Sequence, residues 1–182
     1  GILSLTETLK LTGTLQFSAP NYTVQNGTLE LSRGLLDVDN DTIIASNILL
    51  SQNSTVDIAP DVNLEYQGLS IYIDKYQLTF LGSGTFSNSS SIVLSHLNSL
   101  LILAGDVTIL LIDVKVDSAA GKGIRVESAD ASVTNLNLLA DMGLTFIDDA
   151  YELNVENLNV NSPAQLTGDG NGGWLNVNLL CA

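Results

Sequence analysis

The sequence predicts an all-β protein, a right-handed parallel β-helix (β-solenoid) of about eight coils, with about 20–22 residues and three short strands in each coil. Three observations predict this fold. Short apolar pairs recur once per coil, turn-forming residues recur at a fixed place between them, and branched aliphatic residues are abundant enough to fill a stacked core. Apolar residues make up 45% of the chain and charged residues only 14%, so an ordered core is expected. Right-handed winding is the default for parallel crossovers.

The first strand of each coil is marked by two apolar residues with one other residue between them. This spacing puts both side chains on one face of a strand. The members of the series are Leu9/Leu11, Leu29/Leu31, Ile48/Leu50, Leu69/Ile71, Ile92/Leu94, Val114/Val116, Leu136/Leu138 and Leu158/Val160. A unit of this length cannot bury its own apolar face, so the units are expected to stack on one another.

Two further apolar series predict the second and third strands. The second consists of Leu15/Phe17, Leu36/Val38, Val56/Ile58, Leu78/Phe80, Leu100/Ile102, Ile124/Val126, Leu144/Phe146 and Leu166. The third consists of Val24, Ile44, Leu64, Phe86, Ile109, Ala131, Leu153 and Leu175. Turn formers such as Pro20-Asn21 and Pro60-Asp61 separate them. Leucine-rich repeats have a similar period, but the second strand series replaces their helical half.

Residues 1–182 are predicted to form a single solenoid domain that is uncapped at both ends. Strand-like residues begin at Ile2, and apolar residues continue to Leu180, with no amphipathic helix at either end. Solenoids need capping repeats to stay soluble, and an open coil is an unpaired strand edge. We therefore expect either a piece of a longer rod or copies that stack end to end into filaments.

Charge and composition exclude several classes of function. Six basic residues against 20 acidic ones give a net charge of −14, which argues against nucleic acid and anionic membranes as partners. Leu100 to Ile112, the most apolar stretch, is too short to insert in a membrane as a helix. A single cysteine and a single histidine exclude an internal disulfide and a multi-histidine metal site.

Asparagines recur between the inward-facing aliphatic residues of the later coils. Asn135 and Asn137 are followed one coil period later by Asn157 and Asn159, and the pattern returns, shifted, at Asn176 and Asn178. We expect outward ladders whose amides bond along the rod axis. They hold the coils in register or offer a flat polar face for binding carbohydrate or ice.

Acidic residues recur at an early coil edge. Asp37 lies one coil period before Asp57, and Asp41 lies the same distance before Asp61. Together with Asp39 these carboxylates form a weak candidate site for Ca²⁺, which takes oxygen ligands. The stretch lacks the glycine and the final acid of an EF-hand, and a solvated acidic edge is the alternative. No other cofactor is expected.

Glycosylation sequons and candidate catalytic residues complete the sequence features. Acceptor sequons that mark exposed turns, if the host glycosylates, occur at Asn21, Asn26, Asn40, Asn53 and Asn88. No catalytic residue is predicted, since His96 lacks a neighbouring acid and nucleophile. Carboxylate pairs leave a glycan-cleaving hydrolase or lyase as the enzymatic alternative. The even coil length, however, provides no long loops around a cleft.

One stretch resembles the passenger repeats of bacterial autotransporter adhesins. The resemblance lies in Gly13-Thr14-Leu15-Gln16-Phe17, Asn21-Tyr22-Thr23-Val24 and Gly27-Thr28-Leu29-Glu30-Leu31. The later coils lose the Gly-Thr-Leu opening and match only in period. The resemblance implies a rod that is secreted or displayed on the cell surface, used in adhesion or self-association, and carries over no catalytic residue.

The sequence therefore predicts a non-catalytic, extracellular or cell-surface β-solenoid that serves as a structural or adhesive rod. Its expected partners are copies of itself or glycans on a cell surface. The alternative is a β-helix that binds or cleaves polysaccharides.

Overall fold

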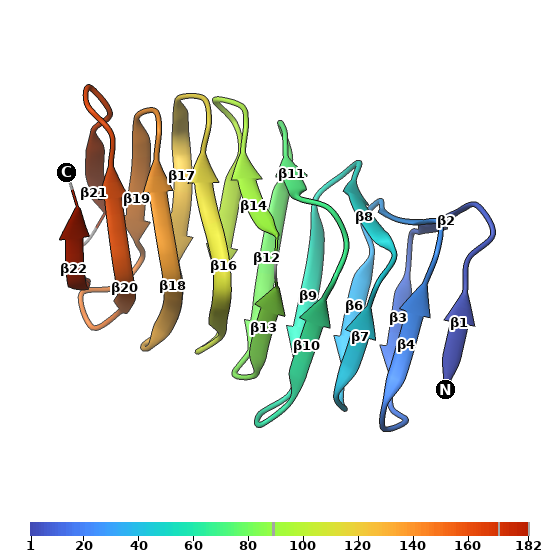
Figure 1. The fold of residues 1–182 in the computed structure, drawn as a ribbon. Coiled ribbons are helices and arrows are strands. Elements are labelled where there is room, and N and C mark those ends of the chain that lie inside the picture. Colours follow the sequence, from blue (N-terminus) through green and yellow to red (C-terminus); the bar gives the residue numbers. More distant parts are fainter. Residues whose placement is uncertain (89, 171, 182) are drawn as a thin grey trace.

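The protein is a parallel β-solenoid of about eight coils, and the prediction of the fold class is confirmed (Figure 1). The computed structural model describes residues 1–88, 90–170 and 172–181, and within them it contains strands and turns but no helix. In Figure 1 the front strands run upward and the rear strands downward while the chain proceeds from right to left, which is a right-handed winding. No element of the described chain is a helix long and apolar enough to cross a membrane.

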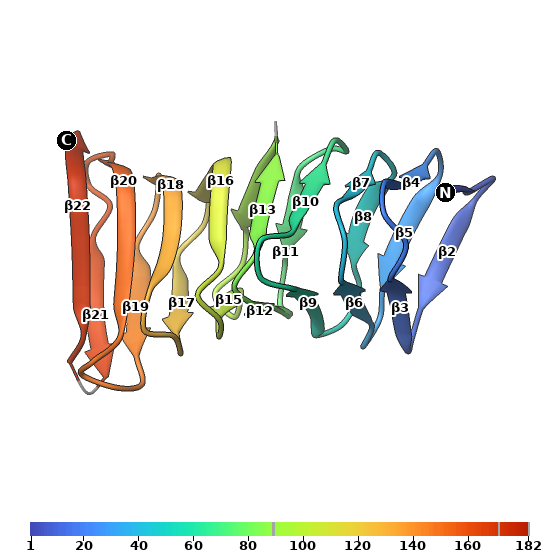
Figure 2. The same ribbon diagram turned by 90° about the horizontal axis from the view of Figure 1, so that it is seen from below.

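Three parallel sheets form the sides of the solenoid, and each is named by its place in Figures 1 and 2. The front sheet contains β1 (Ile2–Ser4), β4 (Tyr22–Gln25), β7 (Thr42–Ile44), β10 (Asn63–Tyr66), β13 (Thr85–Asn88), β16 (Thr108–Val116), β18 (Ala131–Leu138), β20 (Glu152–Val160) and β22 (Trp174–Cys181), with β11 (Ile71–Ile73) and β14 (Ser91–Leu94) beside this path. The rear sheet contains β3 (Thr14–Phe17), β6 (Leu35–Val38), β9 (Ser54–Ile58), β12 (Gln77–Gly82), β15 (Leu100–Leu103), β17 (Ala120–Val126), β19 (Met142–Phe146) and β21 (Leu166–Gly170). The short sheet contains β2 (Thr8–Leu11), β5 (Thr28–Leu31) and β8 (Asn47–Leu50).

The cross-section changes along the rod. The early coils have the three predicted strands, but from β16 onward one long strand replaces two of them. The reason is local sequence, because Leu110-Leu111-Ile112 joins the two halves of β16 with strand formers in place of a turn. Coil length also varies more than predicted, since the step from Leu29 to its partner Ile48 is shorter than the predicted period and the step from Leu144 to its partner Gly168 is longer.

Inward-facing aliphatic and aromatic residues form one continuous core along the rod. The predicted column of Val114, Leu136 and Leu158 is stacked in register and is at most 5% exposed. At about 4.8 Å per coil, eight coils make a rod about 40 Å long. Burial of these residues, each contributing about 1.5–3 kcal/mol, stabilises coils that have few local contacts of their own.

The predicted register of the first and second series is wrong at four places on the inner face. Phe80 rather than Leu78 stacks on Val56, and Leu166 stacks on Met142 rather than on Leu144. Ile71 and Ile73, not Leu69 and Ile71, face inward in β11, and Leu69 is 71% exposed. In β15 the partners of Leu78 and Phe80 are Leu101 and Leu103 rather than Leu100 and Ile102. All four residues of β15 are buried, so alternation could not separate the two registers.

The third series is misaligned at two further coils. Tyr66, not Leu64, stacks on Ile44, while Leu64 lies beside Thr42. Farther along, Ile109 stacks on Val133 rather than Ala131. In both cases the coil is two residues longer than the step that the third series assumed.

Candidate functional site

Two asparagine columns lie on the outside of β18 and β20. The Asn157 side-chain amide donates to Oδ1 of Asn135 at 2.9 Å, and the Asn159 amide donates to Oδ1 of Asn137 at 2.7 Å. All four side chains are half-buried. Each amide satisfies the one a coil away, so these columns link neighbouring coils and leave only part of each amide for a ligand.

Asn176 and Asn178 do not continue these two columns, contrary to the expectation from spacing. Leu175 and Val177 extend the inward columns of Leu153 and Val155, and this packing fixes the register of β22 on β20. The amide of Asn176 therefore donates to Oδ1 of Asn154 at 3.0 Å and to Glu152 at 3.1 Å. These two asparagines belong to a neighbouring strip of the front sheet.

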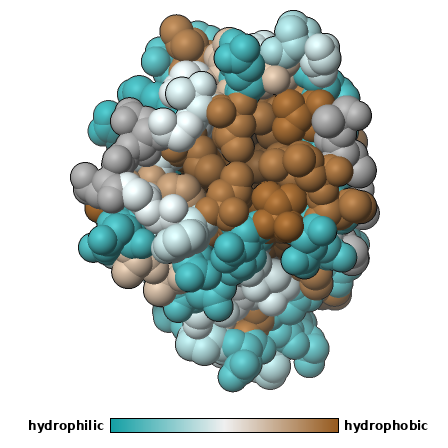
Figure 3. Space-filling view, turned by 90° about the vertical axis from the view of Figure 1, so that its left-hand side faces the viewer, coloured by the Kyte–Doolittle hydropathy of each residue, from teal (hydrophilic) through white to brown (hydrophobic). Residues whose placement is uncertain are grey.

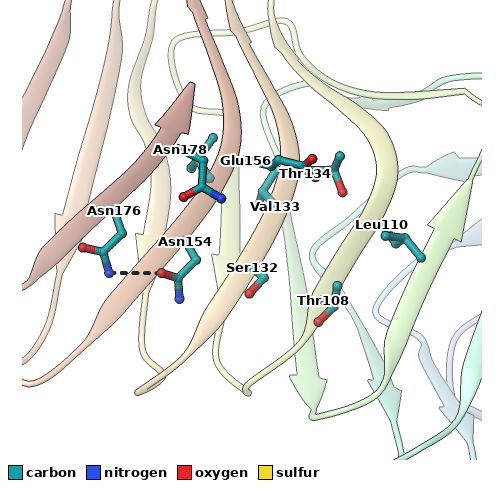
Figure 4. Close-up of a pocket in the computed structure, with 10 residues that line it drawn as sticks. Thr108, Leu110, Ser132, Val133, Thr134, Asn154, Glu156, Asn176 and Asn178 are labelled. Atoms are coloured by element: carbon teal, nitrogen blue, oxygen red, sulfur yellow. Dashed lines mark hydrogen bonds between the residues drawn. The ribbon is translucent and has the colours of Figure 1, made fainter. Parts of the chain in front are cut away.

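This strip, here called the front groove, is a shallow hollow of about 260 Å³ on the outside of the long strands (Figure 4). Its polar lining comes from Thr108, Ser132, Thr134, Asn154, Glu156, Asn176 and Asn178. Thr108, Ser132, Asn154 and Asn176 are successive partners in the strand register, so one hydroxyl or amide is presented by each coil. The groove can offer hydrogen bonds to a polar ligand, but Glu156 is the single titratable group among its described lining residues.

Sequence reasoning missed the front groove except for Asn176 and Asn178. The even spacing of Ser132, Asn154 and Asn176 was visible in the sequence. Thr108, however, is separated from its partner Ser132 by more than one period, because the register shifts within β16. A fixed period could not extend the column to it.

The five aspartates considered for Ca²⁺ do not converge. Asp37 and Asp57 are neighbours on the outside of the rear sheet, as the spacing indicated. Asp39 accepts a hydrogen bond from the Gln16 amide at 2.9 Å, whereas Asp41 accepts the backbone N–H of Asn63 at 2.9 Å, and Asp61 occupies a turn with φ 61°. Asp41 therefore bonds to the first residue of the front-sheet strand β10, whereas Asp37 and Asp57 belong to strands of the rear sheet. Within the described ranges, no three histidine, cysteine or acidic side chains are placed to hold a metal ion.

The surroundings of Asp37 raise the pKa of its carboxyl group. Partial burial raises the pKa of Asp37 above its usual value, and the charges of Asp39 and Asp57 raise it further. The charge of Asp57, one coil away, is one contribution to this shift, and like charges directly opposite each other destabilise a ladder.

Four of the five sequon asparagines lie between strands and Asn88 ends β13, and several of them already use their side chains. Asn21 and Asn26 both have positive φ, at 53° and 62°. The Asn26 amide donates to Ser4 Oγ and the Asn40 amide to the Ser18 carbonyl, each at 2.8 Å, so a glycan attached at either nitrogen would disturb that bond. Asn53 is exposed. The side chain of Asn88 lies outside the described part of the structure.

Comparison with models of protein families, with curated proteins and with solved structures finds no match in any of the three. The class of the protein therefore follows from its own geometry, which is that of a parallel β-solenoid.

Proposed function

We propose that the protein is a non-catalytic rod of the extracellular space or the cell surface, with a structural or adhesive role, which associates with copies of itself through its end coils. The proposal includes kinship with the passenger domains of autotransporter adhesins, for which the stretch from Gly13 to Leu31 is the support. The regular core, the outward ladders and the excess of uncharged polar residues are typical of such rods. The observation that carries the self-association of this 182-residue chain is the exposed apolar face of its outermost described coils.

The inward column of β18, β20 and β22 becomes exposed only at the end of the described chain. Leu136 is 0% exposed and Leu158 is 5% exposed, but Leu180, the next member of the same column, is 62% exposed. Figure 3 shows the result, a broad apolar surface at the C-terminal end of the rod. Leu180 is already partly covered, so covering the rest of its side chain with another coil would contribute about 1–2 kcal/mol.

The opposite end presents a complementary surface. The inward-facing Leu9 of β2 is 37% exposed, whereas Leu29 behind it is 0% exposed. The strands β1, β2 and β3 also pair on one side only within the described chain. A C-terminal coil placed on this end would meet the unpaired edges of these strands. Such head-to-tail contact does not close on itself and generates a filament.

The self-association is tested by light scattering coupled to size-exclusion chromatography over a concentration series, with negative-stain microscopy. The wild-type chain is expected to form linear oligomers. Leu180→Lys puts a charge into the end surface and is expected to shift the chain to monomers. Leu139→Lys, which changes a 49% exposed leucine on the side of the rod, is the matched control.

A wild-type chain that stays monomeric at high concentration would contradict the self-association. Equal effects of the two lysine variants would show that the contact is lateral instead of end to end. Turnover in a glycan-degradation screen would contradict the non-catalytic role.

A further inference from the structure

We propose that the corner between the short sheet and the rear sheet binds a linear acidic glycan that carries one acidic group per disaccharide. This extends the proposed adhesive role, and it is measured separately from self-association. Three adjoining hollows of about 320–350 Å³ form a continuous groove along this corner, because they share Arg33, Asn53, Tyr76 and Gln77. This corner groove is defined by Arg33, Asn53, Lys75, Tyr76, Asn98 and Lys122.

Charge is distributed unevenly over the molecule, and the corner groove is its basic site. The chain has six basic residues. Three of them pair with carboxylates elsewhere, namely Lys10 with Glu30, Lys115 with Asp113 and Arg125 with Glu127. The other three are Arg33, Lys75 and Lys122, and all of them line the corner groove without an ion pair to any described residue.

No acidic residue of the described chain lines these three hollows, although the sequence has 20 of them. Asp74 precedes Lys75 in the sequence but is absent from the lining, and Asp141 lines a separate hollow farther along the rod. In a chain of net charge −14, three cations without a facing carboxylate favour an anionic ligand at this place.

The spacing of the cations follows the coils. Arg33, Asn53, Tyr76, Asn98 and Lys122 come from five successive coils at the same corner. The cations occupy the first, third and fifth of these coils, so they recur about every 10 Å and span about 19 Å. This repeat is comparable to the length of a disaccharide, which is why a glycan with acidic groups on alternate sugars fits the groove.

The remaining side chains suit a sugar. Tyr76 packs against the core, and Lys75 Nζ lies 5.7 Å from the centroid of its ring. An aromatic ring at such a site stacks against the apolar face of a sugar. Asn53 Oδ1 accepts the backbone N–H of Gln77 at 3.0 Å, which leaves the amide N–H₂ of Asn53 to donate to a ligand.

The position of Arg33 is fixed by its neighbours. Its φ is 65°, an uncommon backbone conformation for a residue other than glycine. The turn is held by hydrogen bonds from the N–H of Ser32 to Leu11 and from the N–H of Leu35 to Gly13, at 2.9 and 3.0 Å. A Cβ on Gly34 would lie 2.7 Å from Leu11 Cγ, so glycine is required there. The guanidinium therefore extends from a preorganised turn.

The test compares two triple variants of equal charge, produced in a bacterial host that does not glycosylate Asn53. The groove variant is Arg33→Gln with Lys75→Gln and Lys122→Gln. The control variant is Lys10→Gln with Lys115→Gln and Arg125→Gln. Each lowers the net charge from −14 to −17, since three positive charges are removed. Thermal melts establish whether both variants fold. If the triple groove variant does not fold, the single variant Lys122→Gln takes its place.

Binding is measured with hyaluronan oligosaccharides, which carry one carboxylate per disaccharide, and with uncharged dextran oligosaccharides and single-stranded DNA for comparison. Wild type is expected to bind hyaluronan, and the groove variant to lose affinity by at least about tenfold, whereas the control variant changes it by less than about twofold. Tyr76→Ala is expected to weaken binding as well, and Tyr72→Ala, outside the groove, is not.

Three results would overturn the proposal. Absence of hyaluronan binding by the wild type would refute the site. Equal losses in the two triple variants would mean that net charge, and not the groove, governs binding. Binding of DNA with the same affinity and the same dependence on the groove residues would assign the groove to polyanions in general.

Discussion

The hydroxyl of Tyr66 connects two coils, and its removal by Tyr66→Phe is expected to destabilise the protein by about 2 kcal/mol. The side chain is 1% exposed and stacks against Phe86. Its hydroxyl accepts the backbone N–H of Ile48 at 3.0 Å and donates to the carbonyl of Leu69 at 2.7 Å. The second bond lies in the segment where Leu69 turns outward.

The magnitude follows from the two groups that phenylalanine would leave without a partner. The Leu69 carbonyl is only partly buried and can be hydrated, so the loss of its hydrogen bond to Tyr66 costs little free energy. The N–H of Ile48 is buried, and an unsatisfied buried donor costs about 1–3 kcal/mol. Phenylalanine otherwise keeps the ring packing. For a chain of this size, about 2 kcal/mol corresponds to a fall in Tm of about 4–8 °C.

Urea denaturation and thermal melts of Tyr66→Phe measure this effect. Tyr72→Phe is the matched control, because Tyr72 is 57% exposed, and its change is expected to stay within about 0.5 kcal/mol. A loss below about 0.5 kcal/mol in Tyr66→Phe would refute the reasoning, since it would mean that water or a backbone shift satisfies the Ile48 N–H.

Two further predictions concern the outward columns. A double-mutant cycle of Asn135→Ala and Asn157→Ala, followed by urea denaturation, is expected to give a coupling of about 0.5–1.5 kcal/mol, and simple additivity would contradict the ladder bond. Partial burial raises the folded-state pKa of Asp37, and the charges of Asp39 and Asp57 raise it further, so the cost of its negative charge is absent below the unfolded pKa and fully present above the folded one. Asp57→Asn should therefore raise Tm near about pH 7 but not near about pH 3, and an equal gain at both would argue against repulsion.

Much of the fold could be predicted because strand periodicity and coil periodicity reinforce each other. Val114, Leu136 and Leu158 are spaced by one period and stack as expected. Prediction failed where the apolar pattern was ambiguous, as in the fully buried β15, or where a coil was longer than the step that the series assumed, as between Ile44 and Tyr66. In such places the register of a strand depends on which residues of the adjacent coil it packs against, and a single sequence does not give the positions of those residues.

The candidate sites divide in the same way. The pairs Asn135/Asn157 and Asn137/Asn159 follow from spacing, because both members lie on long strands in constant register. The corner groove could not be predicted from spacing. The stretch from Arg33 to Lys75 is shorter than the stretch from Lys75 to Lys122, although each spans two coils.

By itself, the sequence determined that aliphatic residues recur in strand pairs once per coil, and that a stacked parallel solenoid buries them. It also determined the deficit of basic residues. Only the tertiary structure decided which residues are neighbours across coils, where two sheets merge and which cations lie in one groove. The physical reason is that the core tolerates coils of unequal length, as long as each inward column stays packed. Small differences in coil length therefore accumulate along the rod and set the outer surface.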